Sequence, residues 1–478
     1  MFLANASRIE KATPKRAEGR CLTLGGLSSS PKQTKFPSVP IKWARYGVQG
    51  LSPWHLPPEA SPVYNIPIHP ERRRLRMTHE NKFGLFVHWG MYALTELQEQ
   101  AFARYDLPRE EYEGLKAKFN PVKYDPEEWV LMAKAAGMKY ICFTTKHHDG
   151  FCMWDTQYTD YSIMHTPYGK DVLKMLADAC RKHGMLLGLY YSNPDWHHPQ
   201  GYNDQSTHQW KSANLGTPDF EPYRAYIKNQ ITELLTNYGP IYTLFWDIPP
   251  RISDPSLNEY VRKLQPGIYI NDRGFDAGDF STPEREYDQP ELGRRYPRMT
   301  EACNAIDVQS WGYRRDTDFY SYRHLISSID KTMAMGGSYL LNIGPMADGS
   351  LDPVHVERIR RIGDWFGRMQ GCLECHEADE TDYGVCMTEE WIATQKNGKT
   401  YLHFYNGLPA NVVYLSRYPG LPRKVRLMNT GEELPCSIDV QPGFFNFENG
   451  QADHRYLSIR HIPVDQLASE AVVLEIQW

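Results

Sequence analysis

The stretch TTKHHDGF at residues 144–151 concentrates polar side chains directly after an apolar run. Four residues in it could do chemistry: Lys146, His147, His148 and Asp149. Imidazole and carboxylate groups in a row can ligate a metal ion, relay protons or hydrogen-bond to a sugar. They can also form an ordinary polar loop, so the rest of the sequence must discriminate among these interpretations.

Polar and aromatic residues also follow four other apolar runs. These run ends are His88-Trp89-Gly90, Tyr190-Tyr191-Ser192, Phe245-Trp246-Asp247 and Asn271-Asp272-Arg273. The C-terminal ends of barrel strands lie at one face, and catalytic residues come from several of them. If the runs are parallel strands, five such ends predict a functional site.

Asp247 is the candidate nucleophile, because it closes the apolar run 241–246. An aspartate nucleophile suits glycosyl transfer, in which a second carboxyl about 5–5.5 Å away protonates the leaving oxygen and then activates water. That second group needs a raised pKa. Glu284 and Glu301 are both candidates, and spacing alone does not decide between them.

The elements that must position these residues alternate between strand and helix. The predicted strands are short and nearly continuously apolar, as parallel strands covered on both faces are. They lie at 83–89, 140–145, 186–191, 242–247, 268–271 and 339–343. Helices are predicted between them at 171–183, 224–238 and 354–369, and one begins at Asp125-Pro126 with Asp125 as N-cap and ends before Gly137. This alternation favours a (β/α)8-like (TIM) barrel over an open six-stranded sheet.

The sequence patterns before and after the predicted barrel differ from the strand–helix alternation and from each other. Residues 1–61 are rich in Pro, Ser, Lys and Arg and predict a flexible or loosely ordered extension, so the catalytic domain is expected at 62–371. Short strand-like runs separated by Gly, Pro and Asn predict a C-terminal β-sandwich over 372–478. They lie at 401–405, 412–415, 424–428 and 472–476.

Composition narrows the functional classes. The net charge of −5 gives no argument for a nucleic-acid partner, and no apolar run approaches the roughly 18 residues of a membrane span. The nine cysteines are not evenly spaced, and the first residues lack an apolar signal core. We therefore expect a cytoplasmic protein without disulfides, although removal of a leader would make it a secreted one.

Eight segments, in order, resemble the α-L-fucosidases of glycoside hydrolase family 29. The resemblance extends from about residue 78 to about residue 370. The segments are KFGLFVHWG (82–90), FNPVKYDPEEWVLMAKAAGMKY (119–140), TTKHHDGFCMWDT (144–156), LYYSNPDWHHP (189–199), FWD (245–247), NDRG with GDFSTPE (271–284), SWGYRRD (310–316) and GGSYLLNIGPMADG (336–349).

This resemblance implies a retaining, double-displacement exo-α-L-fucosidase that needs no cofactor or metal. It acts on a small molecule or glycan with terminal α-L-fucose, and transfer to other acceptors and a homo-oligomeric state stay open. Asp247 is the implied nucleophile, and Glu301 is preferred to Glu284 as acid/base because TEAC at 300–303 matches a WExC-like family segment. The substrate-binding residues expected on the same basis are His88, Glu99, His147, His148, Trp154, Tyr190, Arg273 and Trp311.

Two departures from the family pattern concern the walls of the site. A Glu-Trp pair that often follows the HWG segment reads Glu99-Gln100, and the Trp of the WExC-like segment is Thr300. Both departures bear on the preference for the leaving group more than on the chemistry. A neighbouring subunit could supply the missing wall.

Other interpretations compete with the fucosidase. A metal-dependent hydrolase would use ligands from His88, His147, His148, Asp149, His197 and His198, but the sequence has no HExxH motif. A non-catalytic carbohydrate-binding protein would have lost a carboxylate, yet Asp247, Glu284 and Glu301 are all present. The CxxCH pattern at 372–376 is interpreted as a chance match to a haem motif, and Lys146 as the neutralising partner of a nearby carboxylate.

Overall fold

The computed structural model describes residues 82–201, 211, 219–250, 252–285, 295–373, 377–440 and 455–478. The predicted extension at 1–61 lies outside these residues. Within them, no helix is both long and apolar enough to cross a membrane.

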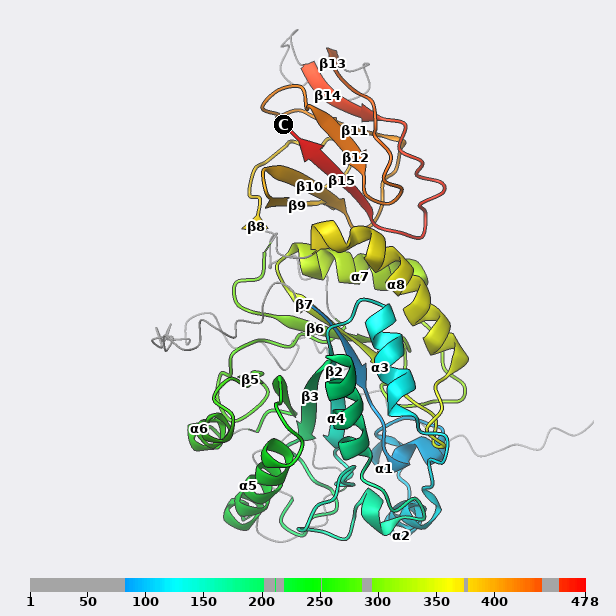
Figure 1. Cartoon of the computed structure of the whole chain (residues 1–478), viewed down its shortest axis with the longest axis vertical. Coiled ribbons are helices and arrows are strands. Elements are labelled where there is room, and N and C mark those ends of the chain that lie inside the picture. Colours follow the sequence, from blue (N-terminus) through cyan, green and yellow to red (C-terminus); the bar gives the residue numbers. More distant parts are fainter. Residues whose placement is uncertain are drawn as a thin grey trace, which may run out of the picture. The chain divides into compact units, whose positions relative to one another are not determined.

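A seven-stranded, wholly parallel sheet lies at the centre of the region before the C-terminal strands (Figure 1). Its strand order is β5-β4-β3-β2-β1-β7-β6. Nearly every strand residue is buried, which explains why the strands appear in the sequence as continuous apolar runs. The strands are β1 (Phe83–Val87), β2 (Tyr140–Lys146), β3 (Leu186–Ser192), β4 (Thr243–Asp247), β5 (Tyr269–Ile270), β6 (Glu301–Ala305) and β7 (Ser338–Ile343).

The segment 280–284 connects the two edge strands of this sheet. Asn271, just after β5, pairs with Phe280, and Glu284 pairs with Cys303 on β6. The Cys303 amide donates to the Pro283 carbonyl at 3.0 Å. This irregular eighth segment links the edges of the curled sheet, so the predicted (β/α)8-like barrel is confirmed.

Helices follow most strands and cover the outside of the sheet. The longer ones are α3 (Pro126–Ala135), α4 (Val172–His183), α5 (Phe220–Thr236), α6 (Pro255–Leu264), α7 (Tyr322–Ala334) and α8 (Pro353–Leu373). Asp125 caps α3 as predicted, because its side chain accepts from the amides of Glu127 and Glu128. Helices α6 and α7 were not predicted. The short helical turns are η2 (Met91–Thr95), α1 (Ala101–Arg104), α2 (Arg109–Glu113), η3 (Gly114–Lys118) and η4 (Ile163–His165).

The C-terminal region is a β-sandwich, as predicted. A five-stranded sheet has the order β12-β15-β10-β9-β8 and a three-stranded sheet the order β11-β14-β13. Apolar side chains of both sheets, including Leu402, Val413 and Leu457, share one core. The strands are β8 (Glu377–Ala378), β9 (Ile392–Lys396), β10 (Lys399–Phe404), β11 (Val412–Leu415), β12 (Lys424–Leu427), β13 (Cys436–Val440), β14 (Arg455–Arg460) and β15 (Val472–Gln477).

Helix α7 contacts the sandwich through polar side chains. Asp330 on α7 accepts from His403 Nδ1 on β10 at 2.9 Å, and both side chains are fully buried. The predicted domain boundary at 371–372 falls in the last turn of α8. The described residues on both sides of it belong to one compact unit, so this boundary stays a prediction. Of the CxxCH pattern, Cys372 is a buried residue of α8, while Glu374, Cys375 and His376 lie outside the described residues.

Candidate active site

Asp247 lies at the C-terminal end of β4 and is buried, with 8% of its surface exposed. Its Oδ2 accepts from the Tyr190 hydroxyl at 2.7 Å, and its Oδ1 accepts from Arg273 Nη1 at 3.1 Å. Burial alone would raise the pKa of Asp247, but the Arg273 charge and the Tyr190 hydrogen bond outweigh it and hold the pKa below the ordinary value. An ionised, oriented carboxylate at this position can act as a nucleophile.

Arg273 joins Asp247 to a second carboxylate, Glu284. The same nitrogen, Nη1, that contacts Asp247 also forms an ion pair with Glu284 Oε1. One oxygen of each carboxylate therefore lies within about 5.5 Å of the other, near the separation that retaining glycosidases use. Thr282 orients the guanidinium, because its hydroxyl accepts from Arg273 Nε at 2.8 Å and its carbonyl accepts from Nη2. Asp247 is covered, whereas Glu284 is exposed, so Glu284 can meet a leaving group or water.

Four of the predicted sugar-binding residues surround Asp247 as an aromatic cluster. The rings of His147 and Tyr190 are stacked at 5.7 Å, and His88 lies edge-on to Tyr190 at 5.5 Å. His148 completes the group with its Nε2 3.8 Å from Asp247 Oδ2. Because these side chains come from the C-terminal ends of β1, β2 and β3, the structure brings them together as the sequence predicts.

Trp311 and Glu99 form another wall of this cluster. The Trp311 ring lies 5.3 Å from that of His88. Buried Glu99 holds the Trp311 loop through its Oε2, which accepts from the amides of Trp311 and Gly312, both at 2.9 Å. Glu99 is therefore close to the site, but these two contacts make it a support for the wall.

Trp154 points away from the site. Its ring is fully buried, and its Nε1 donates to Glu233 on α5 at 3.0 Å. The structure thus places Trp154 in packing between the loop after β2 and helix α5. Its proximity to the histidines in sequence does not bring it to Asp247.

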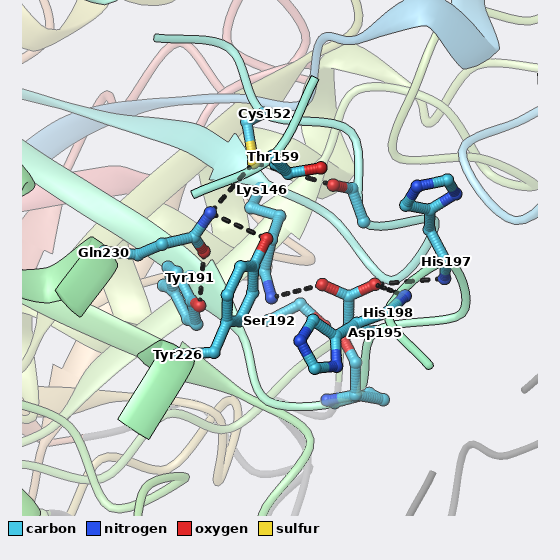
Figure 2. A network of polar contacts seen from close by, with 12 residues as sticks. Lys146, Cys152, Thr159, Tyr191, Ser192, Asp195, His197, His198, Tyr226 and Gln230 are labelled. Carbon is cyan, nitrogen blue, oxygen red and sulfur yellow. Dashed lines mark hydrogen bonds and ion pairs between the residues drawn. The ribbon is translucent and has the colours of Figure 1, made fainter. Parts of the chain in front are cut away.

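Lys146 belongs to a separate buried network beside the site (Figure 2). Its Nζ forms an ion pair with Asp195 Oδ2 at 2.9 Å and lies 4.3 Å from the centre of the Tyr191 ring. Asp195 Oδ1 accepts from the amides of His197 and His198. Lys146 therefore neutralises a carboxylate, as predicted, and fixes the loop after β3 to β2.

Glu301 occupies the opposite end of the barrel from Asp247. It is the first residue of β6 and pairs with Ser338, the first residue of β7. Its carboxylate accepts from the hydroxyl of Tyr140, the first residue of β2, and burial raises its pKa to about 7. Gly84 makes room for the Tyr140 ring, because a Cβ there would lie 2.4 Å from it. The structure does not bring Glu301 to Asp247, whereas it does bring Glu284.

The sequence analysis assigned no individual role to three supporting residues. Asn342 on β7 contacts His88 Nδ1 at 2.6 Å, and Ser192 at the end of β3 contacts His148 Nδ1 at 2.7 Å. Asn193 holds the backbone beside Asp247. The only signal for Asn342 is one polar residue inside the apolar run YLLNI.

The ligand set of the competing metal hydrolase is divided between different contacts. His197 Nδ1 contacts Glu113 at 3.0 Å, and Asp149 accepts from the Tyr112 hydroxyl at 2.8 Å. Among the described residues, no group of three or more His, Cys, Asp and Glu side chains is arranged to hold a metal ion.

A (β/α)8-like barrel with two carboxylates near one another at the C-terminal ends of its strands is an arrangement typical of glycoside hydrolases. The family model for α-L-fucosidase matches residues 58–370. This chain belongs to the α-L-fucosidase family, glycoside hydrolase family 29.

Individual relatives agree with this assignment. The chain is 26% identical to human tissue α-L-fucosidase over 432 residues, which cover 84% of this chain and 87% of the relative. α-L-Fucosidase isoenzyme 1 of Paenibacillus thiaminolyticus superposes with a TM-score of 0.72 at 31% identity, over 85% of this chain and 98% of that one.

The structure of a third relative contains a trapped covalent intermediate. It is a family 29 α-L-fucosidase of Bacteroides thetaiotaomicron, a glutamate-to-glutamine mutant trapped as a covalent intermediate with 2-fluoro-fucosyl fluoride. Its TM-score is 0.67 at 25% identity, over 84% of this chain and 94% of that one.

Proposed function

We propose that this chain removes terminal α-L-fucose from glycans or glycosides by a retaining double displacement. Asp247 is the nucleophile and Glu284 the acid/base. The observation that carries the proposal is the Arg273 nitrogen shared by both carboxylates at the C-terminal end of the barrel. The covalent intermediate of the Bacteroides relative supports it, because a double displacement passes through such a species.

In the first step, an oxygen of Asp247 attacks the anomeric carbon while Glu284 gives its proton to the departing oxygen. The product is a fucosyl ester of Asp247 and a free alcohol. In the second step, Glu284 takes a proton from water, which attacks the same carbon and releases Asp247 as a carboxylate. Two inversions leave the anomeric configuration unchanged.

The surrounding residues suit a deoxy sugar. The imidazoles of His88, His147 and His148 and the phenol of Tyr190 can hydrogen-bond to ring hydroxyls. The Trp311 face can cover an apolar edge. We extend the site to these residues and to Tyr190 because their rings pack around Asp247. We infer that Glu99 supports Trp311 from behind, and we assign no substrate contact to Trp154.

The test is the stereochemistry of the first product. Proton NMR should show α-L-fucose released first from 4-nitrophenyl α-L-fucoside, followed by slow mutarotation. The β-anomer appearing first would refute the double displacement. Absence of release from this substrate and from a fucosylated oligosaccharide, with a folded protein, would refute the activity. Loss of activity in EDTA with recovery in zinc would favour the metal hydrolase instead.

A further inference from the structure

Asn193 is a buried residue to which the steps above give no task. Its own backbone amide donates to the carbonyl of Asp247 at 3.0 Å. Its side-chain Nδ2 donates to two other carbonyls, those of Ile248 at 3.0 Å and Arg273 at 3.1 Å. Asn193, the first residue after β3, thus hydrogen-bonds to the backbone on both sides of the contact between Asp247 and Arg273.

The backbone at Ile248 needs such support. Ile248 has a φ of 58°, in the left-handed region that β-branched residues avoid. The Ile248 backbone also helps to keep the pKa of Asp247 low, so a relaxed φ at Ile248 would change the surroundings of that carboxylate. Conformations of this kind persist only when the surroundings fix them. The hydrogen bond from Asn193 to the Ile248 carbonyl supplies part of that restraint.

A second connection reaches Asn193 from the buried network around Lys146. The Tyr223 hydroxyl donates to the Asn193 carbonyl at 2.6 Å and accepts from Lys146 Nζ at 3.3 Å. Since Lys146 directly precedes His147, the loop with the histidines and the loop with the nucleophile are joined through Asn193.

We propose that Asn193 is a positioning residue that sets the geometry of the Asp247 carboxylate against the Arg273 guanidinium. This inference rests on the proposed function, in which Asp247 attacks the sugar. A loss of alignment of about 1 Å can cost on the order of 100-fold in rate. Asn193 never touches the substrate, so it acts only through the two groups that do.

The primary test replaces Asn193 with alanine and with serine, which retains one donor. We expect Asn193→Ala to lower kcat for 4-nitrophenyl α-L-fucoside by about 10- to 100-fold, with a smaller loss for Asn193→Ser. The matched control is Asn429→Ala in the sandwich. Asn429 is equally buried and its Nδ2 also donates to a backbone carbonyl, that of Ala471, at 2.8 Å. Unchanged kcat in this control is expected even if its melting temperature falls.

The pH profile separates positioning from general loosening. Arg273, Tyr190 and three histidines (His88, His147 and His148) face Asp247, and Glu284 shares Arg273 with it. Because Arg273 helps to keep the pKa of Asp247 low, a displaced guanidinium should move the acidic limb of kcat/KM to higher pH in Asn193→Ala. An acidic limb unmoved in both Asn193 variants would overturn the proposal.

A double-mutant cycle with Arg273→Lys tests the route of the effect. If Asn193 acts through Arg273, the fold-loss in kcat/KM of the double variant should be much smaller than the product of the two single-variant losses. Fully multiplicative losses would refute this route.

Binding of a fuco-configured iminocyclitol, measured by calorimetry, supplies a readout without turnover. We expect Asn193→Ala to weaken it at least about 10-fold, because the cationic ring pairs with ionised Asp247. A wild-type protein that binds the iminocyclitol but cleaves no fucoside would defeat the proposed function alone. Equal affinity of wild type and variant would defeat the role of Asn193 alone.

Discussion

The buried carboxylates at the two ends of the barrel have pKa values shifted in opposite directions. At the C-terminal end, Asp247 contacts the Arg273 guanidinium and the Tyr190 hydroxyl. At the N-terminal end, Glu301 accepts from the Tyr140 hydroxyl, and among the described residues no cation forms an ion pair with it. Burial opposes ionisation at both ends, yet the pKa falls for Asp247 and rises to about 7 for Glu301.

This difference shows that a raised pKa alone does not identify an acid/base catalyst. Glu301 has the pKa that a general acid needs but lies at the end of the barrel that ordinarily serves stability. Glu284 is exposed and shares Arg273 with Asp247. Geometry has to be satisfied before pKa is considered, and here geometry favours Glu284.

The largest expected effect comes from removing the Asp247 carboxylate at the C-terminal end of the barrel. Asp247→Ala should fold normally and lose turnover by roughly 10⁴-fold or more, because the attacking group is gone. Azide should partly restore cleavage of 4-nitrophenyl α-L-fucoside and give the β-fucosyl azide, detectable by mass spectrometry and NMR. Turnover near that of the wild type would show that Asp247 is not the nucleophile.

The next effect compares the two glutamates directly. Glu284→Gln should lower kcat/KM for a fucosylated oligosaccharide by roughly 10²–10⁴-fold, and much less for a substrate with a good leaving group. Glu301→Gln should leave both rates within a few-fold of the wild type. If the pattern is reversed, Glu301 is the acid/base after all and Glu284 supports Arg273.

The sequence is informative wherever burial imposes a simple pattern. Strand β2 was predicted at 140–145 and helix α4 at 171–183, each within a residue of its observed bounds. The strand begins with an apolar run, and the helix is capped by Asp171 and ends before Gly184. The positions of Asp247, His88, His147 and Tyr190 follow from the predicted strands. Each of these residues lies near the C-terminal end of a strand or just beyond it.

The segments around the second carboxylate have no such pattern. Strand β6 reads EACNA and segment 280–284 reads FSTPE, which contains a proline. Neither is an apolar run, so neither was recognised as part of the barrel wall. Glu301 begins its strand whereas Asp247 ends one, and in parallel strands these positions lie at opposite ends. The contact of Trp154 with Glu233 could not be predicted for a different reason, because a sequence motif does not reveal which way a loop turns.

The ion pair of Lys146 and Asp195 tests whether a nearby cation is what distinguishes the two ends. Both side chains are buried, and the pKa of Asp195 lies below its usual value although burial opposes this, because of the Lys146 charge. Lys146→Met should destabilise the fold by roughly 3–5 kcal/mol at pH 7 in urea unfolding. The control Lys174→Met breaks an exposed pair with Asp178 on α4 and should cost less than about 1 kcal/mol. Equal losses would mean that burial does not govern the strength of these pairs.

The smallest effect concerns the stability of the N-terminal end. Because the folded pKa of Glu301 is about 7 and the unfolded one about 4.3, the folded state holds more protons between these values. The contribution of Glu301 to stability is therefore lost as pH rises from about 4 to 7, by about 4 kcal/mol in total.

Glu301→Gln should remove this loss, so its gain over wild type in the free energy of unfolding should be larger at pH 8 than at pH 5. The matched control is Glu475→Gln in the sandwich. Buried Glu475 contacts Lys399 and Arg426, each at 3.1 Å, and its pKa is lowered. Its favourable contribution is present above the unfolded pKa and is lost as pH falls, so Glu475→Gln should be destabilising at pH 8. Two glutamine variants with opposite signs at pH 8 would establish that the nearest cation, and not burial, decides what a buried glutamate does to this fold.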